Sequence, residues 1–311
     1  MGEVMDENPN DNIVSSGHKL GQLIGDWAER YFVLPLLQKV ADELSLFLDS
    51  RFVDRPVRGE KILWPDADGN HVDYDFVLEL NGTPDRLGIP VAFIESFWRR
   101  GIRHAKDKAR DDSGKLVPMR EAYPAARFLG IIAIGAFSRP AISLVHSREI
   151  DLLYVPKDKL VKAFAKLNLV MDYPDTESEQ VKQAIATTFS TAFTLETKLA
   201  VAEELINQMG RASISSYVDR VRSKLAALPQ EFRFIQRLDS QPVVFDSIDE
   251  ATAFLAQPQF SKAHYTESYV YQVIYSDGSE FERTIESVSE LRLLHGQIVA
   301  LADHMNHYKS T

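Results

Sequence analysis

The 311-residue sequence contains no cysteine, and this absence excludes several kinds of protein. It rules out a disulfide-stabilised scaffold, a cysteine-ligated zinc site and catalysis by a thiol. No apolar run approaches the length of about 18 residues that a membrane-spanning helix needs, so we expect no membrane partner. The first twelve residues are acidic and polar, which is unlike a signal peptide and favours a cytoplasmic location.

Several catalytic and cofactor-binding motifs are also missing. The sequence has no GxxxxGK[ST] or GxGxxG motif, which argues against a nucleotide-hydrolysing motor. Four of its eight histidines lie in the last 50 residues without an HExxH or HxxxH pattern, so we assign no zinc site. Ser96 lacks the GxSxG context of a serine hydrolase. The functional signal must therefore come from the acidic and basic residues.

The charge is unevenly distributed along the chain. In total, 45 acidic residues outnumber 35 basic ones, for a net charge of −10. The segment 97–127 departs from this balance, with nine basic and four acidic residues and a net charge of +5. The rest of the chain therefore carries −15. Such an acidic body would repel nucleic acid in general and confine its approach to the basic segment.

The hydrophobic pattern divides the chain into four parts. Residues 1–13 have almost no apolar side chains and are expected to be disordered. Residues 14–175 alternate between helical and strand periods, with a helix over 17–48 that Pro35 kinks or divides. Their other predicted elements are strands over 71–80, 89–96, 128–137 and 151–156 and helices over 97–110 and 139–147. Residues 176–238 are predicted to be helical, and 239–311 to form a small α+β module whose hairpin turns at Asp277-Gly278.

Two carboxylates are expected to lie opposite each other in this arrangement. The strands 71–80 and 89–96 flank a segment rich in turn-forming residues, which predicts an antiparallel hairpin centred near Asp85. That register places Asp75 directly opposite Glu95, with Cβ atoms roughly 5 Å apart. Like charges in such positions are destabilising unless a cation lies between them, and oxygen ligands suit Mg²⁺. A one-residue bulge, or an arginine paired with Glu95, would give the acids a purely structural role.

A basic stretch follows Glu95 at once. On a helix beginning at Phe97, Arg100, His104 and Lys108 share one face. Further cations lie on the adjacent face of this helix. The residues expected to contact phosphates are Arg99, Arg100, Arg103 and Lys106. A carboxylate pair beside phosphate-binding cations suits a phosphodiester substrate. A solvated helix face is the simpler alternative.

The order of these elements resembles the restriction-endonuclease-like, or PD-(D/E)xK, nuclease superfamily over about residues 17–160. Asp75, followed by FVL, matches its first acid, and Glu95, after VAFI, matches its second. The resemblance implies an α/β (α+β) fold with a mixed central sheet flanked by helices. It also implies that the two acids bind Mg²⁺ and that a lysine two residues after the second acid positions or activates water. Phe97 occupies that lysine position here, so Lys108, Arg100 or Arg103 would have to supply the charge.

The resemblance implies further site residues. Members of the superfamily often place an acid of the N-terminal helix near the metals, and Glu29 is the candidate here, although a surface glutamate is an equal alternative. Asp73 shares the predicted face of Asp75 and could be the ligand in its place. Lys108 is expected to contact the scissile phosphate, with His104 orienting water.

These observations predict a Mg²⁺-dependent endodeoxyribonuclease, with Mn²⁺ as a possible substitute, acting in restriction or anti-phage defence. Cleavage of both DNA strands favours a homodimer, and other subunits of a defence system are further potential partners. The alternative from another class is a nuclease-like module with a decayed site that binds DNA or assembles with partners without cutting, and Phe97 supports it. RNA as the substrate is a third option, since nothing in the sequence distinguishes the 2′-hydroxyl.

Overall fold

The computed structural model describes residues 16–103, 105–174, 176–237, 241–258 and 268–309. Over these residues the chain forms a five-stranded mixed sheet, a four-stranded antiparallel sheet, a two-stranded ribbon and the helices around them. A mixed α+β class with a mixed central sheet flanked by helices is therefore confirmed. The predicted disordered tail 1–13 lies outside the described residues.

The N-terminal helical stretch has one buried face and a defect in its middle. Leu20, Ile24 and Trp27 are buried, as their three- and four-residue spacing predicts. Pro35 lies in the first turn of the last segment, and the turns in front of it widen to a π-helix. A proline has no N–H and clashes with the carbonyl four residues earlier, so the predicted division at Pro35 is confirmed. The three segments are α1 (Ser16–Trp27), η1 (Ala28–Val33) and α2 (Leu34–Leu44).

The central sheet combines antiparallel and parallel pairing. Its strands lie in the order β1-β4-β5-β6-β7, with β1, β4 and β5 antiparallel and β5, β6 and β7 parallel. The strand β6 is buried along its whole length, as its continuous apolar run predicts. The strands are β1 (Phe47–Ser50), β4 (Phe76–Leu80), β5 (Ile89–Arg99), β6 (Phe128–Gly135) and β7 (Asp151–Pro156).

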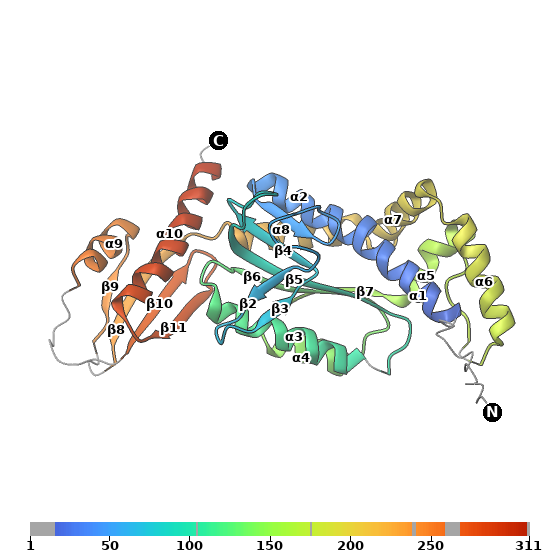
Figure 1. Cartoon of the computed structure of the whole chain (residues 1–311), viewed down its shortest axis with the longest axis horizontal. Helices are drawn as coiled ribbons and strands as arrows, with labels where there is room; N and C mark the ends of the chain where they lie inside the picture. The colour runs from blue at the N-terminus through green and yellow to red at the C-terminus, as the bar shows by residue number, and fades with distance from the viewer. Residues whose placement is uncertain (1–15, 104, 175, 238–240, 259–267, 310–311) are drawn as a thin grey trace, which may run out of the picture.

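Helices cover both faces of this sheet. The helices α3 (Ala105–Ala122) and α4 (Arg139–Ser147) connect the parallel strands and lie on one face, whereas α2 and α8 (Arg211–Leu225) lie on the other (Figure 1). Each face has its own apolar core. Along β5, Phe93 and Phe97 belong to the core under α3, and Ile94 and Trp98 belong to the opposite core. Glu95 therefore shares the α3 face of the sheet with both phenylalanines.

Several predicted elements are wrong in detail. The helix predicted over 17–48 ends at Leu44, and the last two residues of that range belong to β1. The strand predicted over 71–80 is split at Tyr74–Asp75, and its first part, β3 (His71–Asp73), pairs with β2 (Leu63–Pro65) instead of the central sheet. The helix predicted from Phe97 begins only at Ala105, because β5 continues to pair with β6 as far as Arg99. This pairing satisfies backbone groups of residues 97–99, which a helix could satisfy equally well, so local sequence did not decide between them.

The remaining elements form two peripheral groups (Figure 1). The helices α5 (Lys157–Lys166), α6 (Glu179–Ala192) and α7 (Leu195–Met209) pack near α1 at one end of the sheet. A four-stranded sheet in the order β11-β10-β8-β9 forms the other end, and its hairpin turns at Asp277-Gly278 as predicted. Its first strand lies inside the segment 176–238 that was predicted to be helical. These elements are β8 (Pro229–Gln236), β9 (Val243–Phe245), α9 (Ile248–Ala256), β10 (Tyr269–Tyr275), β11 (Glu280–Ile285) and α10 (Val288–Lys309).

Candidate active site

The register between β4 and β5 brings Asp75 and Glu95 together. Phe76 pairs with Ile94, so the next position along the ladder sets Asp75 opposite Glu95. Asp75 lies just before β4, and its Oδ2 accepts a hydrogen bond of 2.7 Å from the backbone N–H of Ser96. The strands do contain a bulge, but it lies between Leu78 and Glu79, away from the two acids. The predicted juxtaposition is thus present.

Glu95 is a buried acid next to other acids. Only 1% of the residue is exposed. Burial, followed by the negative charges of Asp75 and Asp112, raises the pKa of Glu95 to about 9. Burial also raises the pKa of Asp75, against the lowering effect of its hydrogen bond from Ser96. The pKa of each acid is raised although Lys108 and Lys115 lower it, so burial is the dominant effect at both positions.

Lys115 of α3 is the cation that contacts Glu95. Its Nζ lies 3.4 Å from Oε2 and 3.5 Å from Oε1 of Glu95, and 3.4 Å from the backbone carbonyl oxygen of Asp73. Burial opposes the charge on Lys115, but Glu95, Asp112 and Asp75 together raise its pKa above the usual value. Lys115 is therefore a fixed positive charge at the carboxylate pair.

Lys108 lies on the same face of α3 as Lys115, and Asp112 lies between the two lysines along the helix. The Nζ of Lys108 contacts Oδ1 of Asp112 at 2.6 Å and lies 5.6 Å from the centroid of the Phe97 ring. Asp112 is fully buried, and its Oδ2 has no hydrogen-bond partner. Lys108, Asp112 and Lys115 are four and three residues apart, which is the spacing of one helix face. That face lies toward Glu95.

Glu29 approaches the pair from the N-terminal helices. It belongs to the π-helical segment η1, where its side chain is 18% exposed. Burial and then the charge of Asp75 raise the pKa of Glu29 to about 7. Arg51 binds this acid and a neighbour, with Nε 2.8 Å from Glu29 Oε2 and Nη2 2.6 Å from Asp26 Oδ1. Glu29 is therefore close enough to Asp75 for their charges to interact, and both residues line the same cleft.

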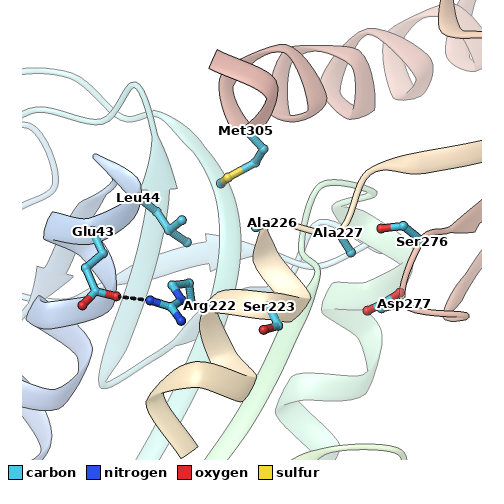
Figure 2. A pocket seen from close by; sticks show the side chains of 9 residues that line it. All are labelled: Glu43, Leu44, Arg222, Ser223, Ala226, Ala227, Ser276, Asp277 and Met305. Carbon is cyan, nitrogen blue, oxygen red and sulfur yellow. Dashed lines mark hydrogen bonds and ion pairs between the residues drawn. The ribbon is translucent and has the colours of Figure 1, made fainter. Parts of the chain in front are cut away.

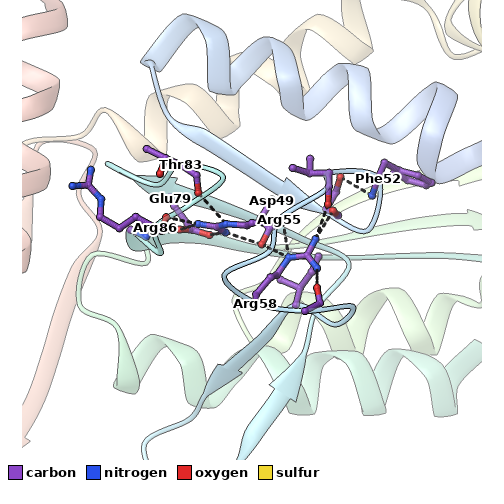
Figure 3. Close-up of polar contacts among 12 residues, drawn as sticks. Asp49, Phe52, Arg55, Arg58, Glu79, Thr83 and Arg86 are labelled. Atoms are coloured by element: carbon purple, nitrogen blue, oxygen red, sulfur yellow. Dashed lines mark hydrogen bonds and ion pairs between the residues drawn. The ribbon is translucent and has the colours of Figure 1, made fainter.

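A network of buried charges holds the segment that carries Arg51 (Figure 3). The guanidinium of Arg55 is fully buried and binds both Asp49 of β1 and Glu79 of β4. Arg58 adds a contact of 2.8 Å from Nε to Asp49 Oδ2. Buried charges of this kind are tolerated only when each is paired. The network fixes the loop after β1 against the sheet, and with it the position of Arg51.

The carboxylate pair and its neighbours line a cleft of about 590 Å³, to which Arg51 contributes but the buried Arg55 network does not. One wall is the face of α1 that carries Gly17, Gly21 and Gly25, four residues apart, and the next position in this series is Glu29. Nothing lies within 4 Å of the place where a Cβ would stand on Gly21 or Gly25, so internal packing does not require glycine at either position. The charged lining residues are the acids Asp26, Glu29, Asp75 and Glu95 and the cations Arg51, Arg99, Arg100, Lys108 and Lys115.

The other predicted site residues are located as follows. Arg99 and Arg100 line the cleft, but they do so from the end of β5 and the bend after it, not from a helix. Arg103 and Lys106 are exposed and are not among the lining residues. The Asp73 carboxylate accepts a hydrogen bond of 3.1 Å from the backbone N–H of Ile62 and does not line the cleft. Of the two alternatives left open by the sequence, the cleft therefore contains Asp75. His104 lies outside the described residues.

Sequence reasoning missed three residues of the site. Lys115, Asp112 and Arg51 were not among the candidates, although the spacing of Lys108, Asp112 and Lys115 on one helix face was visible in the sequence. It was overlooked because the helix was expected to end near residue 110, five residues before Lys115. Arg51 reaches Glu29 only through the fold, and no local pattern indicates this contact.

A second cavity, of about 420 Å³, lies between α2, α8 and the turn of the β10–β11 hairpin (Figure 2). Glu43 and Arg222 form an ion pair of 3.1 Å at its rim, and Leu44 and Met305 contribute apolar surface. Its lining contains Asp277 on the far side from Glu43. These acids do not converge as Asp75 and Glu95 do, so this cavity is the weaker candidate for catalysis.

No family model, no curated protein and no solved structure matches this chain. Over its described residues, the molecule has no helix long and apolar enough to cross a bilayer. The same residues contain no cluster of three or more acidic or histidine side chains arranged to hold a metal ion. The geometry of the cleft is therefore the observation that bears on function.

Proposed function

We propose that this protein is a Mg²⁺-dependent endodeoxyribonuclease with a restriction-endonuclease-like fold. The observation that carries the proposal is the convergence of Asp75 and Glu95 beside Lys115 in one cleft. Two buried carboxylates with raised pKa values are costly to ionise within the fold, and a divalent cation between them would offset this cost. Their chemistry thus fits a hard cation such as Mg²⁺ or Mn²⁺.

The order of the elements supports the proposed fold. A helix precedes three antiparallel strands, and the last of these is followed by a helix and a strand parallel to it. The first acid immediately precedes β4, and the second lies within β5. The resemblance implies a helix, an Asp-bearing strand, a Glu-bearing strand, a helix and a buried strand in this order, and β1 and the β2–β3 ribbon are additional to it.

Lys115 would take the part of the missing motif lysine. Phe97 is 6% exposed and belongs to the apolar core under α3, so it contributes no charge. The Lys115 ammonium, supplied from α3, lies next to Glu95, where the lysine of the motif is expected to act. Because its pKa is raised, Lys115 would act as a cation and not as a base.

In the proposed reaction Asp75 and Glu95 would hold the metal, and Glu29 lines the same cleft without completing a three-acid cluster with them among the residues described. The metal, when bound, supplies activation of the attacking water and neutralises negative charge on the phosphate. Ser96 keeps the Asp75 carboxylate in position through its backbone N–H. Lys115 stabilises the charge that develops on the scissile phosphate, and Arg99 and Arg100 bind phosphates of the same strand. A homodimer would cut both strands, and we propose cytoplasmic restriction or anti-phage defence as the setting, alone or with other subunits.

The test is cleavage of plasmid and phage DNA in Mg²⁺ or Mn²⁺ by the wild type and by Asp75→Asn, Glu95→Gln and Asp73→Asn variants. Asp73→Asn is the matched control, since this acid is two residues from Asp75 but its carboxylate binds Ile62. We expect both cleft variants to lose cleavage and Asp73→Asn to retain it. Equal activity of the Glu95→Gln variant and the wild type would refute the assignment, and cleavage of RNA alone would refute DNA as the substrate.

A non-cutting module remains the second candidate, and one observation favours it. Phe97 is committed to the core, and no third acid completes a metal cluster with Asp75 and Glu95 among the residues described. Such a module would bind DNA through the same cations. Thermal stabilisation by Mn²⁺ distinguishes the two, because an intact acid pair should show it and a decayed site should not.

A further inference from the structure

A separate cavity adjoins the catalytic cleft at Arg100. It has a volume of about 640 Å³ and lies beyond the carboxyl ends of β5 and β6, where Arg99 and Gly135 end the two strands. Arg100 lines both this cavity and the cleft with Asp75 and Glu95. The carboxyl ends of parallel strands are a common place for ligands in α/β proteins. Whether a ligand fits this cavity depends on the residues that line it.

Arg100 is held firmly between the two spaces. Its guanidinium lies 4.4 Å from the centroid of the Tyr173 ring, and its Nη1 donates a hydrogen bond of 2.9 Å to the backbone oxygen of Tyr173. Tyr173 itself is confined by α1, since a Cβ on Gly17 would lie 2.6 Å from its hydroxyl. Arg100 is therefore part of a prearranged wall rather than a freely moving surface side chain.

The rest of the lining combines an exposed apolar side chain, Ile102, with an ion pair between Lys157 and Asp172, both of which line the cavity. Ile102 is 61% exposed, although most large apolar side chains of this chain are buried. The neighbouring Gly101 leaves open space, with nothing within 4 Å of a Cβ built on it. Lys157, the first residue of α5, contacts Asp172 at 2.8 Å and supplies the second cation of the cavity. An apolar contact next to cations is the combination that a nucleobase and its phosphate require.

We propose that this cavity binds the nucleotide that flanks the scissile phosphate in a DNA strand. The base would pack against Ile102, its phosphate would lie near Lys157, and Arg100 would bind the phosphate between the cavity and the cleft. The strand would thus pass from the carboxylates across Arg100 into the cavity. This inference rests on the proposed function, because it takes DNA as the occupant of the cleft.

The experiment measures binding of fluorescein-labelled oligonucleotides by anisotropy in Ca²⁺. The first probe is oligothymidylate, and the second has the same backbone with an abasic residue at every position. The variants are Ile102→Ala and Lys157→Gln. Their matched controls are Leu293→Ala, an equally exposed apolar residue of α10, and Lys166→Gln at the other end of α5. Arg100 is left unchanged because it also lines the catalytic cleft.

We expect Ile102→Ala to weaken binding of oligothymidylate by about threefold or more and to leave the abasic probe unaffected, because the variant removes apolar surface that contacts the base. Lys157→Gln should weaken both probes and lower the salt dependence. Both controls should bind like the wild type. Equal effects of Ile102→Ala on the two probes, or a Lys157→Gln variant indistinguishable from Lys166→Gln, would overturn the proposal.

Cleavage of plasmid DNA by the same proteins tests the proposed nuclease function separately from the proposed nucleotide-binding cavity. If the wild type cuts DNA in Mn²⁺ and the cavity variants bind and cut equally well, the cavity assignment fails and the nuclease assignment stands. If the wild type neither binds nor cuts DNA, both fail. Binding of oligouridylate without binding of oligothymidylate would overturn DNA as the occupant of the cavity.

Discussion

Metal binding by the Asp75–Glu95 pair should depend steeply on pH. Burial and the charges of Asp75 and Asp112 raise the pKa of Glu95 to about 9, so this acid carries a proton at neutral pH in the metal-free protein. A divalent cation binds the ionised form and must displace that proton. Apparent affinity for Mn²⁺ should therefore increase as pH rises and level off above pH 9.

The size of the effect follows from the number of protons released. One proton gives a tenfold change in the apparent dissociation constant per pH unit, or about 100-fold between pH 6.5 and 8.5. At saturating metal this corresponds to about 2.7 kcal/mol of additional stabilisation. Glu29, with its pKa raised to about 7, would add a second proton and a steeper slope below neutrality. Titration calorimetry in buffers of different ionisation enthalpy measures both the affinity and the proton release.

The Glu95→Gln variant serves as the reference. Glutamine has no proton to release, so its remaining metal affinity should be low and nearly independent of pH above 8. A wild-type affinity that does not change between pH 6.5 and 8.5, or a variant that binds Mn²⁺ as tightly as the wild type, would contradict the reasoning.

The metal-free protein should show the opposite trend. The fold favours protonated Glu95, so this group contributes stability that is present below its unfolded pKa of about 4.5 and is lost as pH rises through about 9. The unfolding temperature of the metal-free wild type should therefore decrease from pH 6 to 9. The unfolding temperature of the Glu95→Gln variant should decrease less over the same range.

Three further predictions concern the cation, the buried network and the glycine wall of the site. Lys115→Met should lower the cleavage rate by about 10²-fold or more while DNA binding changes little, as is typical when one preorganised donor at the reacting group is removed; a variant that cuts at the wild-type rate would exclude Lys115 from the reaction. Arg55→Met leaves buried Asp49 and Glu79 without their shared cation and should lower the free energy of unfolding in urea by about 3–5 kcal/mol; an unchanged urea midpoint would show that the network is not needed. Gly21→Ala should stabilise α1 by up to about 1 kcal/mol and yet weaken DNA binding, because its methyl group would point into the cleft; unchanged binding would exclude close contact of DNA with α1.

The carboxylate pair could be predicted because it depends on strand register alone. The period of a strand is two residues, and the turn-forming segment between β4 and β5 fixes which residues are opposite. The bulge between Leu78 and Glu79 shifts the pairing near the turn, yet the pairs from Phe76 to Leu78 retain the predicted register. Asp75 and Glu95 lie on the Phe76–Leu78 side of the bulge. Their predicted pairing is therefore correct, although the prediction did not include a bulge.

The end of β5 could not be predicted, because it depends on pairing with residues of β6 that lie 36 positions further along the chain. Residues 97–99 continue as a strand because they pair with residues 133–135 of β6. Their sequence, rich in cationic and aromatic side chains, is equally compatible with a helix. Arg99 and Arg100 consequently reach the cleft from the end of a strand, and α3 begins and ends later than expected.

Under the proposed nuclease function, the absence of a lysine at position 97 and the position of Lys115 on α3 have one physical cause. Glu95 and Phe97 are two residues apart in a strand, so both side chains lie on the α3 face of the sheet. The helix extends to Ala122, which brings its Lys108, Asp112 and Lys115 face across that strand. Because Lys108 already lies over the Phe97 ring, an ammonium at position 97 would meet a second cation in an apolar core. Phe97 instead packs in the apolar core under α3, and the same helix brings the ammonium of Lys115 to 3.4 Å from Glu95.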